Sequence, residues 1–302
     1  MVATKLNKEQ QQAVEHQNGP LLIVAGAGTG KTTVITQRIE WLINNNLASP
    51  EEILALTFTE KAAGELVERV DKALPYGYCD LWISTFHSFA ERILKEHGLD
   101  MGLTTDFKLL DTTQSWLLIR KNLAKFPLDY YRPLGNANKF ISALLQHFSK
   151  CKDELVTPDN YLDLAESYRL DNDLEHDEDA STEYKRLQEI AESYKIYQQL
   201  LLDNNYLDFG DLINYVYELF KKRPAILKKY QQQFKYILID EFQDTNYAQY
   251  QLIKLLAAPQ NNITAVGDDD QAIYKFRGAS ISNILQFRKD YDNAQEIFLN
   301  TN

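Results

Sequence analysis

The sequence predicts an α/β fold in which a parallel sheet covered by helices is interrupted by an inserted, mostly helical domain. Three observations predict this fold. Short apolar runs fall into two groups, one before about residue 90 and one after about residue 230. Helical patterns separate several of the runs, as in sheets whose strands are buried on both faces. Between the groups, from Gln114 to Phe220, apolar residues recur at a spacing of three and four, with no convincing strand.

Each expected strand is a nearly continuous apolar run, too short to be a separate helix. We therefore expect residues 1–90 and 222–302 to form the two parts of one α/β domain, and residues 91–221 to form the helical insertion. The expected strands are Leu21–Ala25, Ile53–Phe58, Leu81–Phe86, Tyr236–Asp240, Ile263–Val266 and Glu296–Leu299.

Composition limits the classes of protein that the chain can belong to. It has 302 residues, 44% of them hydrophobic and 25% charged, and no apolar stretch long enough to cross a bilayer. The start lacks the apolar core of a secretory signal, and the cysteines are Cys79 and Cys151, so we expect a cytoplasmic protein with free thiols and no membrane contact. The net charge of −11, much of it in an expected solvated loop at residues 171–179, argues against a basic coat but allows a local groove.

The tract Ala25–Thr32 (AGAGTGKT) follows the first apolar run and precedes a helical pattern. Its glycines allow successive backbone N–H groups to turn around a polyphosphate, and the following helix adds its positive end. Lys31 supplies a point charge, and the Thr32 hydroxyl can bind Mg²⁺. Ala25 stands where the general pattern has Gly, so it must have a negative φ. The tract therefore predicts a phosphate-binding loop for a nucleotide.

Aromatic side chains recur near the ends of expected strands, in Thr57-Phe58-Thr59 and Thr85-Phe86-His87, and they alternate with basic residues in Tyr274-Lys275-Phe276-Arg277. Proteins hold unpaired nucleic-acid strands by stacking bases on such rings and by neutralising phosphates. Core packing is the alternative for any single aromatic residue. The common position at carboxyl ends of strands favours a shared groove for a single strand.

Two acidic residues, Asp240 and Glu241, end the strand that begins at Tyr236. Opposite a phosphate loop, Asp240 would hold Mg²⁺, and Glu241 would orient or deprotonate the water that attacks the γ-phosphate. A further polar cluster, Gly267 to Gln271, follows the next strand, and Gln271 is a candidate sensor of the γ-phosphate. Each segment alone could be a polar turn, but together with the phosphate loop they predict nucleotide hydrolysis.

These motifs resemble, in order, those of the UvrD/Rep-type superfamily 1A DNA helicases, which are ATP-driven motors that translocate on single-stranded DNA. The resemblance implies a RecA-like P-loop domain, called 1A, interrupted by a helical domain, called 1B, in an ATP-dependent 3′→5′ helicase. The matching segments are residues 6–10 (Q motif), 25–32 (the family's form of the phosphate loop), 56–63 and 84–88 (motifs Ia and Ib, both DNA-contacting in the family), 207–212 (a motif near the return from 1B), 240–245 (motif II) and 266–278 (motif III).

The resemblance also implies a set of site residues, with ATP and Mg²⁺ as cofactors and single-stranded DNA as partner. The catalytic residues would be Lys31, Asp240, Glu241 and Gln271. The nucleotide-binding residues would be Gln10, which reads adenine, Ala25, Gly26, Ala27, Gly28, Thr29, Gly30, Lys31, Thr32 and Thr33, and the metal ligands would be Thr32 and Asp240. The DNA-binding residues would be Thr57, Phe58, Thr85, Phe86, His87, Tyr274, Lys275, Phe276 and Arg277.

Three positions depart from the family's pattern. Glu60 stands where most members have Asn, so a negative charge would lie near DNA phosphates. Thr33 stands where relatives often have Arg, which removes one possible nucleotide contact, and Phe276 replaces a common Trp, which leaves a smaller ring for stacking.

Residues 299–302 resemble the approach to motif IV. We therefore expect the second RecA-like domain of the same protein, with its arginine fingers, to be missing and to be the partner of this chain. Loss of such arginines costs about 10³–10⁵ in turnover in comparable systems, so weak or absent ATPase is expected. Two alternatives remain: a fragment that binds ATP or DNA without chemistry, and a P-loop enzyme unrelated to nucleic acid, which would leave the aromatic motifs unexplained.

Overall fold

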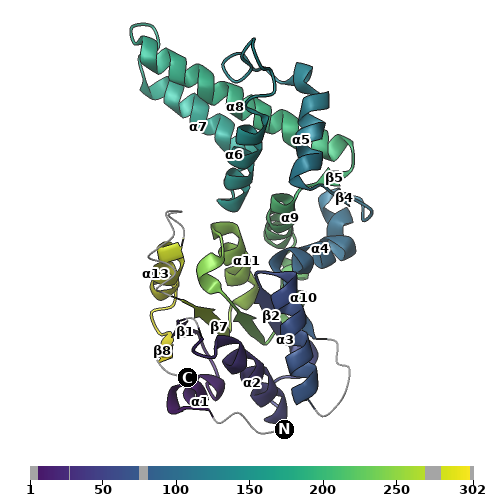
Figure 1. Ribbon diagram of the computed structural model, residues 1–302, viewed down its shortest axis with the longest axis vertical. Helices are drawn as coiled ribbons and strands as arrows, with labels where there is room; N and C mark the ends of the chain where they lie inside the picture. Colours follow the sequence, from purple (N-terminus) through teal and green to yellow (C-terminus); the bar gives the residue numbers. More distant parts are fainter. Residues whose placement is uncertain (1–5, 27, 75–80, 269–279, 300–302) are drawn as a thin grey trace. The chain divides into compact units, whose positions relative to one another are not determined.

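The computed structural model describes residues 6–26, 28–74, 81–268 and 280–299, with the side chains of 280–282 left aside. The chain forms two compact units (Figure 1). Unit 1 comprises Met1–Arg92 and Val216–Asn302, and unit 2 comprises Ile93–Tyr215. The chain leaves unit 1 within helix α4 (Phe86–His97) and returns to it within helix α9 (Phe209–Lys222).

Unit 1 is built on a six-stranded sheet in which all neighbouring strands are parallel, in the order β3-β2-β6-β7-β1-β8. The predicted parallel sheet is confirmed, and each expected strand is present with ends that shift by at most one residue. Because the strands are parallel, their carboxyl ends lie along one side of the sheet, which we call the carboxyl edge. The strands are β1 (Leu21–Ala25), β2 (Ile53–Thr57), β3 (Trp82–Thr85), β6 (Tyr236–Ile239), β7 (Ile263–Gly267) and β8 (Gln295–Leu299).

Several helices of unit 1 begin at residues whose side chains cap the helix N-terminus. The Thr59 hydroxyl accepts a hydrogen bond from the Ala62 N–H at the start of α3, and Asn7 and Gln10 form a reciprocal capping box at the start of α1. The remaining elements of this unit are α1 (Lys8–Val14), α2 (Lys31–Asn44), α3 (Glu60–Ala73), α10 (Pro224–Gln233), α11 (Tyr247–Ala257), α13 (Ser280–Asp290) and the 3₁₀ turns η1 (Pro50–Glu52) and η4 (Phe242–Asp244).

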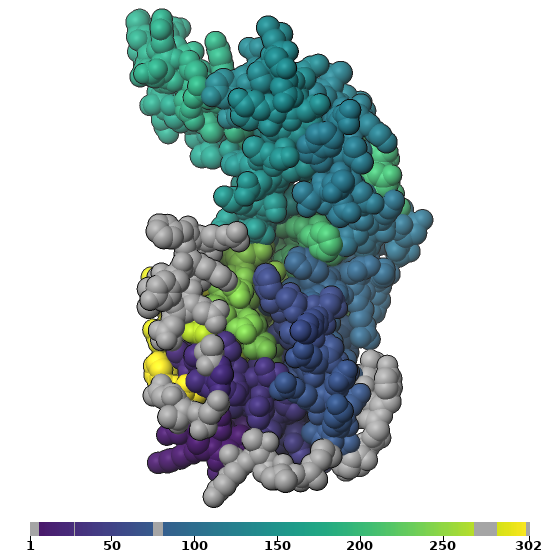
Figure 2. Space-filling model, in the orientation of Figure 1, coloured from purple at the N-terminus to yellow at the C-terminus, as the bar shows by residue number. Residues whose placement is uncertain are grey.

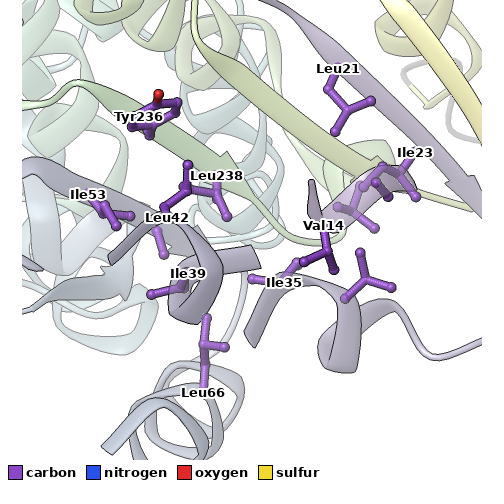
Figure 3. Packing of buried hydrophobic residues seen from close by; sticks show 14 of the residues in the cluster. Val14, Leu21, Ile23, Ile35, Ile39, Leu42, Ile53, Leu66, Tyr236 and Leu238 are labelled. Carbon is purple, nitrogen blue, oxygen red and sulfur yellow. The ribbon is translucent and has the colours of Figure 1, made fainter. Parts of the chain in front are cut away.

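Both faces of this sheet are buried. Successive residues of β1 face opposite sides, and all five are at most 4% exposed. On one face, Ile39 and Leu42 of α2 pack near Leu238 of β6 (Figure 3), and helix side chains of α2 and α3 form the visible surface there (Figure 2). On the other face, aromatic rings of strands, turns and helices pack edge to face, among them Trp82, Phe89, Phe234, Phe242, Tyr250 and Phe287.

Unit 2 is mostly helical, so the predicted helical insertion is confirmed. Helices α7 and α8 lie side by side (Figure 1), and the Phe148 ring stacks on Tyr194 and Tyr197, with centroids 4.9 and 5.5 Å apart. The elements are η2 (Gly98–Met101), β4 (Lys108–Leu109), α5 (Thr112–Lys121), η3 (Leu123–Lys125), α6 (Ile141–Asp153), α7 (Pro158–Asp171), α8 (Glu178–Asp203) and β5 (Tyr206–Leu207).

The expectation of no strand between Gln114 and Phe220 was wrong in one place, since β5 lies in this range and forms a short parallel pair with β4, which precedes it. Two residues per strand are too few to produce an alternating pattern. The acidic run 171–179 is exposed, as predicted, apart from the half-buried Leu174, although its ends belong to α7 and α8. Across the described residues, no helix has both the length and the apolarity that a membrane span requires.

A buried ion cluster lies inside unit 2. The Lys152 ammonium is 2.7 Å from Asp208 Oδ2 and 2.8 Å from Asp211 Oδ1, and the Tyr197 hydroxyl donates to Asp208. Burial opposes the charge of Lys152, but the two carboxylates outweigh it and raise its pKa. A Cβ at Gly210 would lie 2.8 Å from the Cβ and Cδ of Lys152, so the lysine needs a glycine at this position.

Candidate functional site

The predicted phosphate loop joins the carboxyl end of β1 to the start of α2. Gly28 and Gly30 have φ values of +78° and +90°, a left-handed conformation that glycine adopts without strain. Ala25 is the last residue of β1, so its backbone is extended, as its side chain requires. The Thr29 hydroxyl closes the loop by donating to the Gly26 carbonyl at 2.8 Å. Ala27 lies outside the described residues.

Helix α2 starts at Lys31, with Thr32 and Thr33 in its first turn, so the positive end of its dipole faces the loop. Lys31 Nζ is 3.0 Å from Glu241 Oε2 and 3.9 Å from Asp268 Oδ2. Its side chain is 11% exposed. The structure thus brings together two of the predicted catalytic residues, Lys31 at the start of α2 and Glu241 just after β6.

The acidic pair after β6 has two different environments. Burial, together with the neighbouring charge of Glu241, raises the pKa of Asp240 to about 6. The Glu241 N–H donates to Asp240 Oδ1 at 3.0 Å. Glu241 has a φ of +51°, which is costly for a residue with a side chain and is typical of functional sites. A carboxyl with a raised pKa next to a residue with a strained backbone is typical of functional sites.

The predicted adenine reader, Gln10, links α1 to the phosphate loop. Its Nε2 donates to the Thr29 carbonyl at 3.0 Å, and its Oε1 accepts from the Asn7 N–H at 3.0 Å. Both ends of the amide are therefore engaged within the protein. The buried Arg38 supports the same helix from α2, donating to the carbonyls of Ala13 and Val14. Helix α1 thus stabilises the phosphate loop through the hydrogen bond from Gln10 to Thr29.

Sequence reasoning assigned no role to Gln243, which connects the ends of β6 and β7. Its Nε2 donates to Glu241 Oε2 at 2.8 Å, and its Oε1 accepts from the Asp268 N–H at 3.0 Å. The side chain is 2% exposed, and a Cβ at Gly267 would come within 3.1 Å of its Oε1. The available signal in the sequence was its position two residues after the acidic pair.

Replacing Gln243 by Leu is expected to destabilise unit 1 by about 1–3 kcal/mol, because the buried Asp268 N–H loses its acceptor and Glu241 loses a donor. Urea unfolding followed by circular dichroism measures the loss. Gln11→Leu is the control, since the exposed Gln11 side chain donates to Glu15 one turn along α1. Equal stability of the two variants would contradict a bridging role for Gln243.

The predicted DNA-binding residues differ in exposure. Phe58 is 52% exposed at the end of β2, whereas Thr57, Thr85 and Phe86 are at most 5% exposed, and the Phe86 ring lies in the core. Burial lowers the pKa of His87, which Glu60 partly opposes, so the imidazole is neutral at pH 7. Gln271 and the segment Tyr274, Lys275, Phe276 and Arg277 lie outside the described residues.

No group of three or more His, Cys, Asp or Glu side chains in the described part of the chain could hold a metal ion. The predicted ligands for Mg²⁺ are the Thr32 hydroxyl and the Asp240 carboxyl. Both are hard oxygen ligands, and Mg²⁺ commonly binds through one or two protein groups together with substrate phosphates and water. The donor set therefore fits the predicted ion.

Comparison with known proteins gave a consistent result. Residues 6–292 match the family model described as the UvrD/REP helicase N-terminal domain. The chain is 43% identical over 298 residues to the ATP-dependent DNA helicase PcrA of Bacillus subtilis, and 42% identical over 297 residues to PcrA of Staphylococcus aureus. It is 44% identical over 301 residues to a probable DNA helicase II homolog of Rickettsia felis. Each match covers 98% of this chain but only 37%, 38% and 42% of the respective relative.

Proposed function

The chain belongs to the UvrD/REP helicase family, and we propose that it forms the ATP-binding and single-stranded-DNA-binding part of an ATP-dependent 3′→5′ DNA helicase. In this proposal unit 1 corresponds to domain 1A and unit 2 to domain 1B. The relatives are named ATP-dependent DNA helicases, which supports the use of ATP and the binding of DNA.

The observation that carries the proposal is the order of side chains along the carboxyl edge. At β6, β7 and β1 lie Glu241, Asp268 and the phosphate loop, with Lys31 in contact with both carboxylates. At β3 and β2, on the other half of the same edge, lies the exposed ring of Phe58. Open α/β sheets bind ligands at this edge. Strand β6 adjoins both halves, so a nucleotide and a DNA strand would bind on either side of it.

The proposed chemistry follows from these positions. Backbone N–H groups of the loop and the Lys31 ammonium would bind the β- and γ-phosphates. Thr32 and Asp240 would hold Mg²⁺, which neutralises phosphate charge when bound. Glu241 would accept the proton of the attacking water. Since Lys31 also pairs with Glu241, its charge is shared between substrate and base, and the Gln243 amide would keep the base in position.

A DNA-binding measurement tests the proposal. Fluorescent oligo-dT is expected to bind the chain with an affinity that falls as salt is added, because phosphate contacts release counterions. Phe58→Ala is expected to weaken binding by about tenfold, since loss of a base–aromatic stack costs about 1–3 kcal/mol.

Phe298→Ala provides the matched control. Phe298 is also an exposed aromatic residue, at 45%, but it lies in β8 at the opposite end of the strand order from β2 and β3. Its loss should leave the affinity for oligo-dT within about twofold. Binding that responds neither to salt nor to Phe58 would contradict a DNA site at this edge.

A further inference from the structure

Glu60 connects the ends of two neighbouring strands at the carboxyl edge. It is the first residue of α3, just after β2, and its carboxylate reaches the last residue of β3 and the first turn of α4. Glu60 Oε1 is 2.7 Å from the Thr85 hydroxyl oxygen and 2.6 Å from the Ser88 hydroxyl oxygen. The Ser88 N–H in turn donates to Thr85 Oγ1 at 3.1 Å. One carboxylate oxygen therefore organises both hydroxyls.

The two hydroxyl protons are held within this group: Ser88 donates to the carboxylate, and the Thr85 hydroxyl has two acceptors, Glu60 Oε1 at 2.7 Å and Ser88 Oγ at 3.0 Å. A hydroxyl has a single proton, and hydrogen bonds of this length to an ionised acceptor are among the stronger ones in proteins. The hydrogen bonds from Ser88 and Thr85 lower the pKa of Glu60, so the group is ionised at neutral pH. A phosphate oxygen is an acceptor, and it cannot use a hydroxyl whose proton is already donated elsewhere.

The neighbours of Glu60 are of the kind that would attract a single strand. Phe58 lies two residues before it with a half-exposed ring, and Lys61 directly follows it with a side chain that is 87% exposed. In the sequence, a half-exposed ring and a cation, which pairs with Glu65, thus flank an anion. Repulsion between that anion and a phosphate would act over a few ångströms at a solvent-exposed site, where salt screens it.

We propose that Glu60 limits the affinity of the carboxyl edge for single-stranded DNA, by holding the hydroxyl protons of Thr85 and Ser88 and by placing negative charge beside them. This inference rests on the proposed function, because it needs DNA to bind at β2 and β3. A strand held weakly here is released readily, as stepwise movement along DNA requires.

Replacing Glu60 by Gln tests the proposal. Gln has nearly the same shape but no charge, and its amide N–H groups can donate to phosphate. Oligo-dT is expected to bind the Glu60→Gln variant about three- to tenfold more tightly at low salt, with a smaller gain at high salt. Glu68→Gln is the matched control, since it removes the same charge from the same helix at a site that pairs with Lys72. A Glu60→Gln variant that binds no more tightly than Glu68→Gln would overturn the proposal.

A second variant tests the role of the hydroxyl protons. Glu60→Ala removes the acceptor oxygen as well as the charge, so it is expected to bind oligo-dT more tightly than Glu60→Gln, whose amide oxygen still accepts from both hydroxyls. Adding Ser88→Ala to Glu60→Ala is expected to remove about half of that further gain, because Ser88 then no longer donates to phosphate. Retention of the full gain would overturn the assignment of the protons. Failure of the proposed function has a different signature: neither the unsubstituted chain nor Glu60→Gln would bind oligo-dT in a way that depends on salt and on Phe58. If binding of oligo-dT depended on Phe58 but did not change with Glu60→Gln, the inference about Glu60 would be overturned and the proposed function would stand.

Discussion

In a longer chain that spans the full length of the relatives, replacing Glu241 by Gln is expected to leave ATP binding intact and to lower ATP turnover by about 10²–10⁴-fold, the usual contribution of a positioned general base. Gln preserves the side-chain shape, so the Gln243 amide retains an acceptor. Lys31 loses the nearer of its two ionic partners, at 3.0 Å, and keeps Asp268 at 3.9 Å. More of its charge is then available to phosphate, so ATP should bind at least as tightly as before. Phosphate release with and without oligo-dT measures turnover, and a fluorescent ATP analogue measures binding.

Glu296→Gln is the control for this substitution, because Glu296 pairs with Arg288 at the surface. It should change turnover by less than about twofold. If the Glu241→Gln variant retained turnover within threefold of the unsubstituted protein, Glu241 would not be the base. If it lost ATP binding as well, Glu241 would serve to shape the phosphate site.

Replacing Lys152 by Met should destabilise unit 2 by about 3–5 kcal/mol, the cost of leaving buried charges without their partner. Asp208 and Asp211 would then face each other across the start of α9, each accepting the other's backbone N–H at 3.0 Å. Urea unfolding measures the loss, and hydrogen exchange in α6 and α8 locates it in this unit.

Two further variants separate charge from packing in this cluster. Lys150→Met removes a charge from the exposed face of the same helix and should change stability by less than about 0.5 kcal/mol. Adding Asp208→Asn and Asp211→Asn to Lys152→Met should recover at least half of the loss, because no buried charge remains. A Lys152→Met variant as stable as Lys150→Met would show that the ion pair contributes nothing.

The sheet could be predicted from the sequence because its signal is local. The run Leu21–Ala25 is apolar throughout, and a strand buried on both faces needs no other pattern. Glycines at 28 and 30 likewise occur where the backbone is left-handed. The β4–β5 pair could not be predicted, since its stability comes from a partner about 100 residues away and not from its own two residues.

The site could be predicted only in part, because exposure depends on tertiary packing. Phe58 and Phe86 both stand at ends of expected strands, yet the strand ends at Thr57 in one case and a helix begins at Phe86 in the other. The first ring is half exposed and the second is buried. The hydrogen bonds of Gln243 and Glu60 could not be predicted from the sequence either, because each joins residues at the ends of different strands.

The position of β1 in the sheet has a consequence for the synthesis of this chain. Its two neighbours are β7 and β8, so Leu21 pairs with Thr264 and Gln295, which are translated about 240 and 270 residues later. At about 5–20 residues per second, β1 waits roughly ten to fifty seconds for its partners. During that time its apolar side chains are uncovered and the hydrogen-bonding groups on both sides of its backbone lack their strand partners, while β2 and β3 can already pair with each other. The strand that carries the phosphate loop is therefore a part of the nascent protein that a chaperone would protect.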